Sequence, residues 1–349
     1  MNKFVYIPSF SGGFFGQMLK EDGHIGKIPV RFYDDAAQDI IKHNAFLTTA
    51  GHFYKQDDYT NSIGLDLDIN KNLVFGDSGG YQIATGAIKW DISIRDRIFN
   101  WLENNSNVAI NLDIPPRLTW AGKDKECLEI SLDNFKYFEK HQSGKTKFMN
   151  VLQGNGLDSR KNWYKEVSNF NFNGWALGGT AGKYLDFFNS VYILLKNKEH
   201  LNKENYLFHF LGTSTINQFS FYLQLQKSLN EIGSNVIVTC DSSTPQRAVI
   251  WGTYYTEFNL KDGRFHNAVF PNIKHQSDVF ANMKNFKWPE LCEFDKMINE
   301  NYDWKEYIDN PKEKGNIKFM SAMTLHNFAM FKDAISKVEN IVNQDIYFQ

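Results

Sequence analysis

The sequence predicts a (β/α)8 barrel that carries a C-terminal helical appendage. Eight short apolar segments recur through the first 241 residues, and helix-like segments separate most of them. Aspartates or glycines stand at the ends of most of these segments, where barrel enzymes keep their chemistry. The alternative is an open doubly wound sheet, but eight units and the polar strand ends favour the barrel.

The predicted strands are nearly continuous in apolar character, as strands buried on both faces are. They span residues 4–9, 45–50, 73–77, 108–113, 148–153, 174–178, 207–212 and 236–241. Apolar residues at helical spacing predict helices over residues 92–104, 128–140, 184–196 and 216–232. Between residues 50 and 73 the pattern predicts no clear helix.

We expect residues 1–241 to form the barrel core with its active-site mouth. Residues 242–349 are expected to form an appendage packed on the barrel, so that the whole chain is a single domain. Residues 251–270 are aromatic and turn-rich, and residues 273–316 are polar without a clear repeat. Residues 319–342 predict one helix whose apolar stripe belongs to the core.

Composition narrows the class of protein. The chain has 349 residues, of which 42% are hydrophobic, and its net charge of -2 gives no hint of nucleic acid. It contains no run of eighteen apolar residues, and its first eight residues lack the pattern of a signal peptide. Cys127, Cys240 and Cys292 lie far apart in the sequence, which suits a reducing compartment. We therefore expect a cytoplasmic protein without a membrane partner.

Residues 73–82 contain the first candidate site, because a buried strand there ends in Asp77, Ser78 and two glycines. Glycines let the backbone turn tightly and let a flat ligand approach, while partial burial raises the pKa of an acid. Alone, Asp77 is better explained as the cap of the next helix. Asp113 and Asp241 end two further strands, and three acids at one mouth indicate a site for a flat polar ligand.

Three carboxylates can divide the work of exchanging a base on a sugar. One attacks carbon and forms a covalent intermediate, and a second donates and later accepts a proton. The third accepts hydrogen bonds from the N–H groups on one edge of the base. Tyr81 can stack on the face of the base, and Gln153 and the Gly179 amide can read another edge.

An ordered series of motifs resembles the tRNA-guanine transglycosylases. The six residues from Asp77 to Gln82 match the family signature DSGG[FY]Q. The matching segments are residues 77–82 (DSGGYQ), 151–154 (VLQG), 176–179 (ALGG), 210–212 (FLG), 241–252 (DSSTPQRAVIWG), 259–265 (NLKDGRF) and 325–327 (LHN).

The resemblance implies a role for each acid: Asp241 is the nucleophile that attacks C1′ of the target guanosine, Asp77 the general acid and base, and Asp113 the group that holds the base. The implied substrate-binding residues are Ser78, Tyr81, Gln82, Asp113, Gln153, Gly154, Gly178, Gly179, Thr180, His209 and Leu211. For His209, a core histidine satisfied by hydrogen bonds is the more common alternative.

Departures from the family pattern change the expected substrate and cofactor. The tRNA enzymes hold a structural zinc with CxCxxC and the histidine of the last helix, but here Cys292 alone precedes His326, so we expect no zinc and no other cofactor. Lys183 replaces an acid of the glycine loop, and Ile250 replaces an arginine in a region that contacts the anticodon loop. The chain therefore looks more like the phage and bacterial branch that inserts 7-deazaguanines into DNA.

The expected function is exchange of guanine in DNA for a 7-deazaguanine such as the 7-cyano form, in the host cytoplasm if a phage encodes the protein. Backbone phosphates are expected to contact Lys183, Arg247, Arg264 and His266. The alternatives are the same chemistry on tRNA and a non-catalytic binding subunit. Those subunits lose the nucleophile, whereas Asp77 and Asp241 are both present. The oligomeric state is left open between monomer and homodimer.

Overall fold

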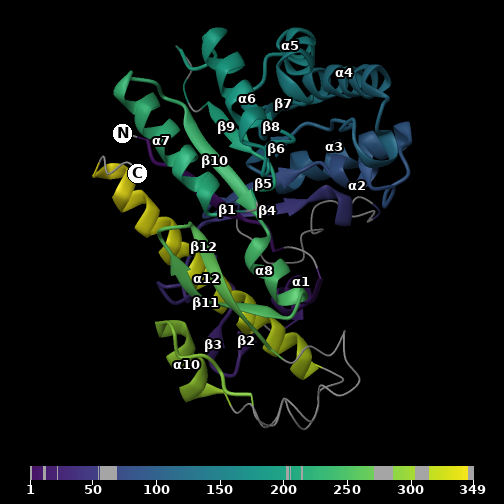
Figure 1. Ribbon diagram of the computed structural model, residues 1–349. Helices are drawn as coiled ribbons and strands as arrows, with labels where there is room; N and C mark the ends of the chain where they lie inside the picture. The colour runs from purple at the N-terminus through teal and green to yellow at the C-terminus, as the bar shows by residue number, and fades with distance from the viewer. Residues whose placement is uncertain are drawn as a thin grey trace. The chain divides into compact units, whose positions relative to one another are not determined.

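The computed structural model describes residues 2–10, 13–21, 23–53, 55, 69–201, 204, 206–213, 215–270, 286–302 and 314–344. The chain divides into two compact units (Figure 1). The barrel unit comprises Met1–Ser9, Ala45–Ser214 and Phe221–Ser242. The second unit comprises Phe10–Asn44, Thr215–Ser220 and Ser243–Gln349, so an N-terminal segment clusters with the C-terminal residues.

The barrel unit confirms the predicted fold class. Eight strands pair side by side, every pair is parallel, and the first and last strands of the order also contact each other, so the barrel is nearly closed. In spatial order they are β1 (Val5–Pro8), β10 (Ile237–Ser242), β9 (Leu207–Phe210), β8 (Gly174–Leu177), β7 (Lys147–Leu152), β6 (Val108–Ile110), β5 (Leu73–Asp77) and β4 (Ala45–Thr49). The strand carboxyl ends therefore meet at one mouth.

Helices alternate with these strands, as the sequence predicts (Figure 1). They are α2 (Gly80–Ala84), α3 (Ile92–Asn105), α4 (Asp124–His141), α5 (Gly156–Val167), α6 (Tyr184–Lys196) and α7 (Asn217–Glu231). Asp91 begins α3 because its carboxylate accepts the Ser93 N–H at 2.8 Å. After β4 the chain forms the short 3-10 helix Ala50–His52, and residues 56–68 of the same link lie outside the described residues.

Successive side chains of β9 point alternately towards the surrounding helices and into the barrel interior. Phe210 faces the helices, where its ring lies 4.9 Å from Phe187 and 4.5 Å from Tyr222, centroid to centroid. The preceding residue, His209, faces inward and packs against Phe75 of β5, with ring centroids 5.1 Å apart. The same period of two directs the acids at the strand ends into the mouth.

The second unit has its own aromatic core. The ring of Phe328 lies 5.4 Å from Phe10 and 5.3 Å from Phe32. Its elements are α1 (Gly13–Glu21), β2 (His24–Ile25), β3 (Ile28–Pro29), α8 (Thr244–Ile250), β11 (Thr253–Asn259), β12 (Arg264–Val269), α10 (Glu293–Asn301) and α12 (Lys314–Asn343). The long helix α12 contacts β11, and the predicted C-terminal helix lies within it.

Across the described ranges, no helix combines the length and the apolar character needed to cross a membrane.

Candidate active site

Asp77 ends β5 at a turn that only glycines can make. Gly79 has φ +85°, a left-handed conformation that favours glycine, and it begins α2. A side chain at Gly80 would collide with the backbone carbonyl of Asp113. The Ser78 hydroxyl donates to the carbonyl of Asn111 at 3.1 Å. These contacts hold the turn after β5 directly against the end of the neighbouring strand, and with it bring Asp77 towards Asp113.

Asp113 is the first member of a hydrogen-bonded chain that joins the segments after two neighbouring strands, β6 and β7. The amide of Gln153 donates to its carboxylate at 2.8 Å, and Arg117 donates to the Gln153 carbonyl oxygen at 3.2 Å. The amide of Gln153 is thereby oriented, with its N–H groups towards the acid. A side chain at Gly178 would collide with the amide of Gln153. The glycine after β8 therefore leaves the space that the Gln153 side chain occupies.

Asp241 lies on β10, and its carboxylate faces the end of β9. Its Oδ1 accepts the Gly212 N–H at 2.7 Å, and its backbone carbonyl accepts the Thr213 N–H at 2.9 Å. His209 Nε2 lies 3.5 Å from the same Oδ1. The neighbouring Ile7 of β1 is its register partner. Asp241 is buried, and the contacts that its carboxylate makes with the described residues all fall on Oδ1.

The three acids lie close enough to influence one another. Burial raises the pKa of Asp77, and the negative charge of Asp241 raises it further; hydrogen bonds from Thr49 and the Gly79 N–H, together with nearby His209, oppose the shift. Thr49 is the register partner of Asp77 on β4. An acid with a raised pKa near a second carboxylate is suited to proton transfer.

Burial also raises the pKa of Asp113 to about 6, against the opposing effect of Gln153 and Arg117 and with a further rise from the charge of Asp77. Asp77 is therefore electrostatically linked to both other acids. These contacts bring Asp77, Asp113, Asp241, Gln153 and His209 together within the barrel unit.

The remaining predicted substrate residues differ in exposure. Tyr81 is 58% exposed on α2, which leaves its ring available for stacking. Gln82 donates to the Thr49 hydroxyl at 3.5 Å, and its buried carbonyl oxygen has no partner. Gly154 has φ +120° and packs on Ser159.

Two further predicted residues line the wall between β8 and β9. Thr180 is buried and donates to the Leu177 carbonyl at 3.4 Å. Leu211 donates its N–H to the same carbonyl at 3.2 Å. The Thr180 side chain and the Leu211 backbone therefore lie next to the residue that precedes the Gly178–Gly179 turn.

The residues predicted to contact nucleic acid divide between the two units. Lys183 is exposed and precedes α6 in the barrel unit. Arg247, Arg264 and His266 belong to the second unit, and all three are exposed. Arg247 lies over the ring of Trp251 at 4.9 Å. Arg264 and His266 alternate with the packed Phe265 on β12, so they share one face of the hairpin.

Two arginines of the site were not predicted. Arg117 follows the two prolines after Asp113, a position that a search for cations beside the strand ends could have found. Arg160 is fully buried in α5, where it donates to Ser190 at 2.9 Å and to the Gly178 carbonyl at 3.0 Å. It fixes the glycine turn from behind, a long-range contact for which the sequence carries no local signal.

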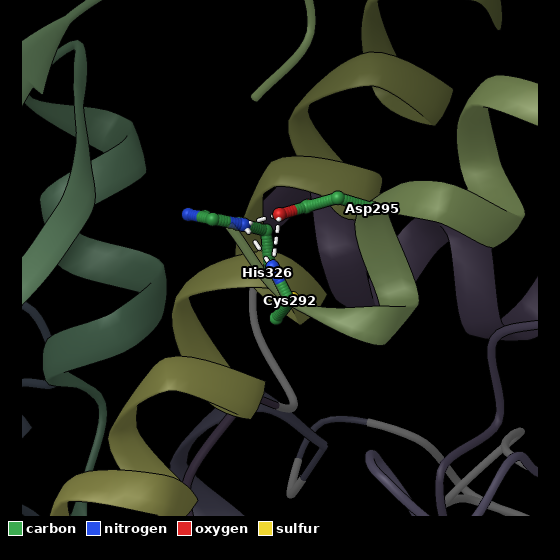
Figure 2. Close-up of side chains that lie close together, drawn as sticks. All are labelled: Cys292, Asp295 and His326. Atoms are coloured by element: carbon green, nitrogen blue, oxygen red, sulfur yellow. Dashed lines mark hydrogen bonds and ion pairs between the residues drawn. The ribbon is translucent and has the colours of Figure 1, made fainter. Parts of the chain in front are cut away.

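The second unit contains a separate cluster formed by half-buried Cys292 and the buried residues Asp295 and His326 (Figure 2). His326 Nδ1 lies 2.7 Å from Asp295 Oδ1 and 4.0 Å from the Cys292 sulfur. His326 Nε2 lies 2.8 Å from the carbonyl of Tyr255, which can only accept, so Nε2 carries a proton. A thiol, a carboxylate and an imidazole are all common metal ligands.

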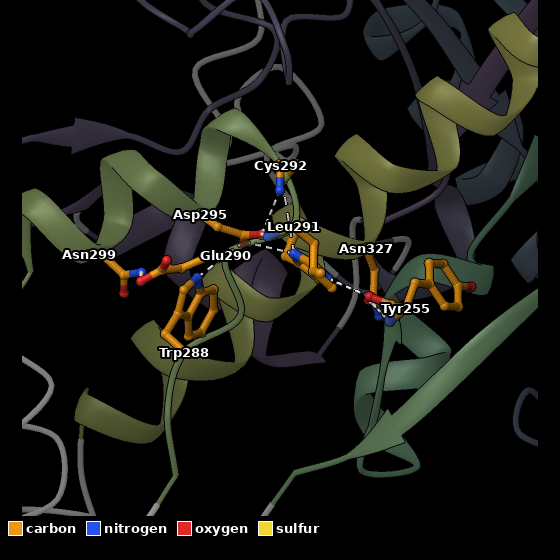
Figure 3. A network of polar contacts seen from close by, with 9 residues as sticks. Tyr255, Trp288, Glu290, Leu291, Cys292, Asp295, Asn299 and Asn327 are labelled. Atoms are coloured by element: carbon orange, nitrogen blue, oxygen red, sulfur yellow. Dashed lines mark hydrogen bonds and ion pairs between the residues drawn. The ribbon is translucent and has the colours of Figure 1, made fainter. Parts of the chain in front are cut away.

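The carboxylate of Asp295 is already saturated with N–H donors (Figure 3). Its Oδ1 accepts Trp288 Nε1–H at 3.1 Å, and its Oδ2 accepts the Leu291 and Cys292 N–H groups at 2.9 and 3.0 Å. Two ligands of a tetrahedral zinc lie about 3.3 Å apart, whereas Nδ1 and Oδ1 are in direct hydrogen-bond contact. With a single thiol, these residues do not fit the four-ligand zinc site of the resembled family.

The fold and the mouth define a class of protein: a (β/α)8 barrel with three interacting buried or half-buried acids at the carboxyl ends of its strands. Neither the protein-family models nor the curated proteins searched contain a match to this chain.

Proposed function

We propose that the protein is a guanine transglycosylase that exchanges guanine in DNA for a 7-deazaguanine, such as 7-cyano-7-deazaguanine. The observation that carries the proposal is the pairing of Asp77 and Asp241 across the barrel mouth, where the charge of one raises the pKa of the other. A nucleophile and a proton-transfer group are what a base exchange requires. The ordered motifs described above add independent support.

The reaction proceeds by two displacements at C1′. The Asp241 carboxylate attacks C1′ as the bond from C1′ to guanine N9 breaks, and Asp77 gives its proton to the departing guanine. The 7-deazaguanine then enters, gives its N9 proton to Asp77 and attacks C1′, and the bond between C1′ and Asp241 breaks. Two displacements retain the configuration at C1′, and Asp77 ends in its starting protonation state.

Base recognition falls to the chain of polar groups beside Asp77. Asp113 accepts the N–H groups on the N1 and N2 edge of the base, and Gln153 and the Gly179 N–H contact its other edge. Tyr81 is exposed and can cover the face of the base. The target base must leave its stack to enter this mouth.

We assign the polynucleotide as DNA because Ile250 replaces the second arginine expected after the nucleophile, and Lys183 replaces an acid in the glycine loop. Arg247, Arg264 and His266 are exposed and are proposed to contact backbone phosphates, which makes binding weaken as salt rises. The chemistry needs no cofactor, and the three free cysteines suit a cytoplasmic protein.

The experiment is incorporation of labelled guanine and labelled 7-cyano-7-deazaguanine into duplex DNA, single-stranded DNA and tRNA. The proposal expects label in DNA and none with Asp241→Asn. Label in tRNA alone would overturn the DNA assignment and leave the alternative, a tRNA-guanine transglycosylase. No exchange into any of the three polymers would overturn base exchange itself.

A further inference from the structure

His209 is a fully buried histidine whose two ring nitrogens have different surroundings. Nδ1 lies 2.8 Å from the hydroxyl of Thr239. Thr239 is the register partner of His209 on β10 and lies two residues before Asp241, so both side chains point to the same face of the strand. Nε2 has no hydrogen-bond partner among the residues that the structure describes, and it lies 3.5 Å from Asp241 Oδ1. The ring is held on one face by Phe75.

The surroundings determine where the imidazole carries its proton. A Thr hydroxyl can donate to Nδ1, whereas the atom facing Nε2 is a carboxylate oxygen, which accepts. The proton therefore belongs on Nε2, pointing at Asp241. A buried polar hydrogen without a partner is costly, so this N–H has a strong tendency to close on the carboxylate.

The remaining distance is small. Closing it by about 0.6 Å gives the usual N–H···O length of roughly 2.9 Å, and catalytic hydrogen bonds are often long until substrate binds. Oδ1 already accepts the Gly212 N–H at 2.7 Å. With both donors on Oδ1, no residue that the structure describes donates to Oδ2, the other oxygen of the carboxylate.

We propose that His209 is a positioning residue for the nucleophile: its Nε2–H and the Gly212 N–H hold Asp241 Oδ1, so that Oδ2 is the oxygen that attacks C1′. Thr239 acts through His209: its hydroxyl donates to Nδ1 and thereby keeps the imidazole proton on Nε2. The inference rests on the proposed function, and it deepens it by assigning different tasks to the two oxygens of Asp241.

The test is the rate of covalent adduct formation between the protein and DNA in a single turnover without incoming base. His209→Phe keeps the ring packing and removes both nitrogens, and adduct formation is expected to slow by about 10- to 100-fold. His209→Gln, whose amide N–H can reach the Nε2 position, is expected to recover part of the rate. Thr239→Val is expected to slow it by a smaller factor, and Thr239→Ser to restore it.

Thr48→Val is the matched control, because Thr48 is buried on β4 and its hydroxyl also lacks a partner. It is expected to leave adduct formation unchanged. Unaltered melting temperatures across the series show that a slower rate does not reflect unfolding. An adduct rate in His209→Phe equal to that of the natural protein overturns the positioning role while base exchange stands.

A second measurement does not depend on activity. The ¹⁵N spectra of the imidazole are expected to show a protonated Nε2 in His209, and Asp241→Asn is expected to shift that resonance. A spectrum with the proton on Nδ1 alone overturns the inference. If the natural protein forms no adduct at all, the proposed function fails, and the spectra still decide whether His209 faces Asp241 as an N–H donor.

Discussion

Each unit contains a buried histidine that faces an aspartate: His326 is hydrogen-bonded at both ring nitrogens, whereas His209 is hydrogen-bonded at one. His326 has a partner within 2.8 Å on both nitrogens, and its partner Asp295 accepts three further N–H groups. His209 has one partner, and its Nε2 stops 3.5 Å short of Asp241. Both imidazoles are fully buried, so exposure does not explain the difference.

The difference separates a structural cluster from a site prepared for a ligand. A fully satisfied buried network specifies a single arrangement and adds rigidity, whereas an unpaired buried polar group destabilises the fold, and beside a catalytic acid it marks a group that can act on a ligand. The acids of the mouth follow the second pattern, because burial holds the pKa values of Asp77 and Asp113 above their ordinary range. The comparison therefore predicts opposite responses to substitution in the two regions.

The largest expected effect is at the nucleophile. Asp241→Asn is expected to reduce exchange by on the order of 10⁴-fold, because a carboxamide cannot form the covalent intermediate. The melting temperature should change little. Asp133→Asn, at an exposed acid on α4, is the control and should exchange at the natural rate. Retained exchange in Asp241→Asn would remove the acid pair from the mechanism.

In the second unit the large effect falls on stability. Asp295→Ala is expected to lower the free energy of unfolding by about 3–5 kcal/mol, because it leaves the buried His326 and three N–H groups without their acceptor. Urea unfolding measures the loss. A change below 1 kcal/mol would mean that the network does not have the structural role assigned to it.

At Asp113, removing the carboxylate is expected to raise the free energy of unfolding at neutral pH, whereas removing that of Asp295 lowers it. The pKa of Asp113 is raised to about 6 from 3.8, so between those values the folded state binds the proton more tightly than the unfolded state, and stability falls as pH rises. The loss over this window is at most about 3 kcal/mol. Asp113→Asn keeps an acceptor for Gln153 and removes the titration.

The measurement for Asp113 is urea unfolding at pH 4 and at pH 7. The variant is expected to lose less stability between the two than the natural protein, and to be the more stable of the two at pH 7, although it binds the base poorly. Equal pH dependence in both proteins would show that the Asp113 carboxyl does not titrate in this window.

The smallest expected effect concerns the cluster of Cys292, Asp295 and His326, and it tests whether these residues form hydrogen bonds with one another or bind a metal ion. Chelation is expected to leave the melting temperature unchanged, and metal analysis to find no stoichiometric zinc. Cys292→Ser is expected to change the free energy of unfolding by less than about 1 kcal/mol, because serine serves at least as well as cysteine as the N-cap that precedes α10. Loss of a bound metal together with several kcal/mol of stability would contradict the metal-free assignment.

Sequence patterns predicted the barrel well because its signals are local. The predicted strand over residues 73–77 and helix over residues 184–196 have the observed bounds, since each ends at a polar or turn residue. The acids Asp77, Asp113 and Asp241 follow from the rule that parallel strands end at one mouth.

The remaining features depend on contacts between distant residues. No strand was predicted over residues 251–270, yet β11 and β12 form a hairpin there, held by Tyr255 stacked on Phe265 at 4.0 Å. Phe10–Asn44 joins the second unit through aromatic contacts to α12, more than 280 residues away. Periodicity carries no information about such partners, and the same holds for the Asp295–His326 pair.

The central claim is that Asp241 forms the covalent bond to the nucleotide while Asp77 transfers the proton. The most direct measurement is to trap the protein with DNA in the absence of incoming base, digest it and locate the modified residue by mass spectrometry. The account predicts a deoxyribose-linked peptide that contains Asp241. Modification of Asp77 instead, or release of guanine without any linked peptide, would contradict it.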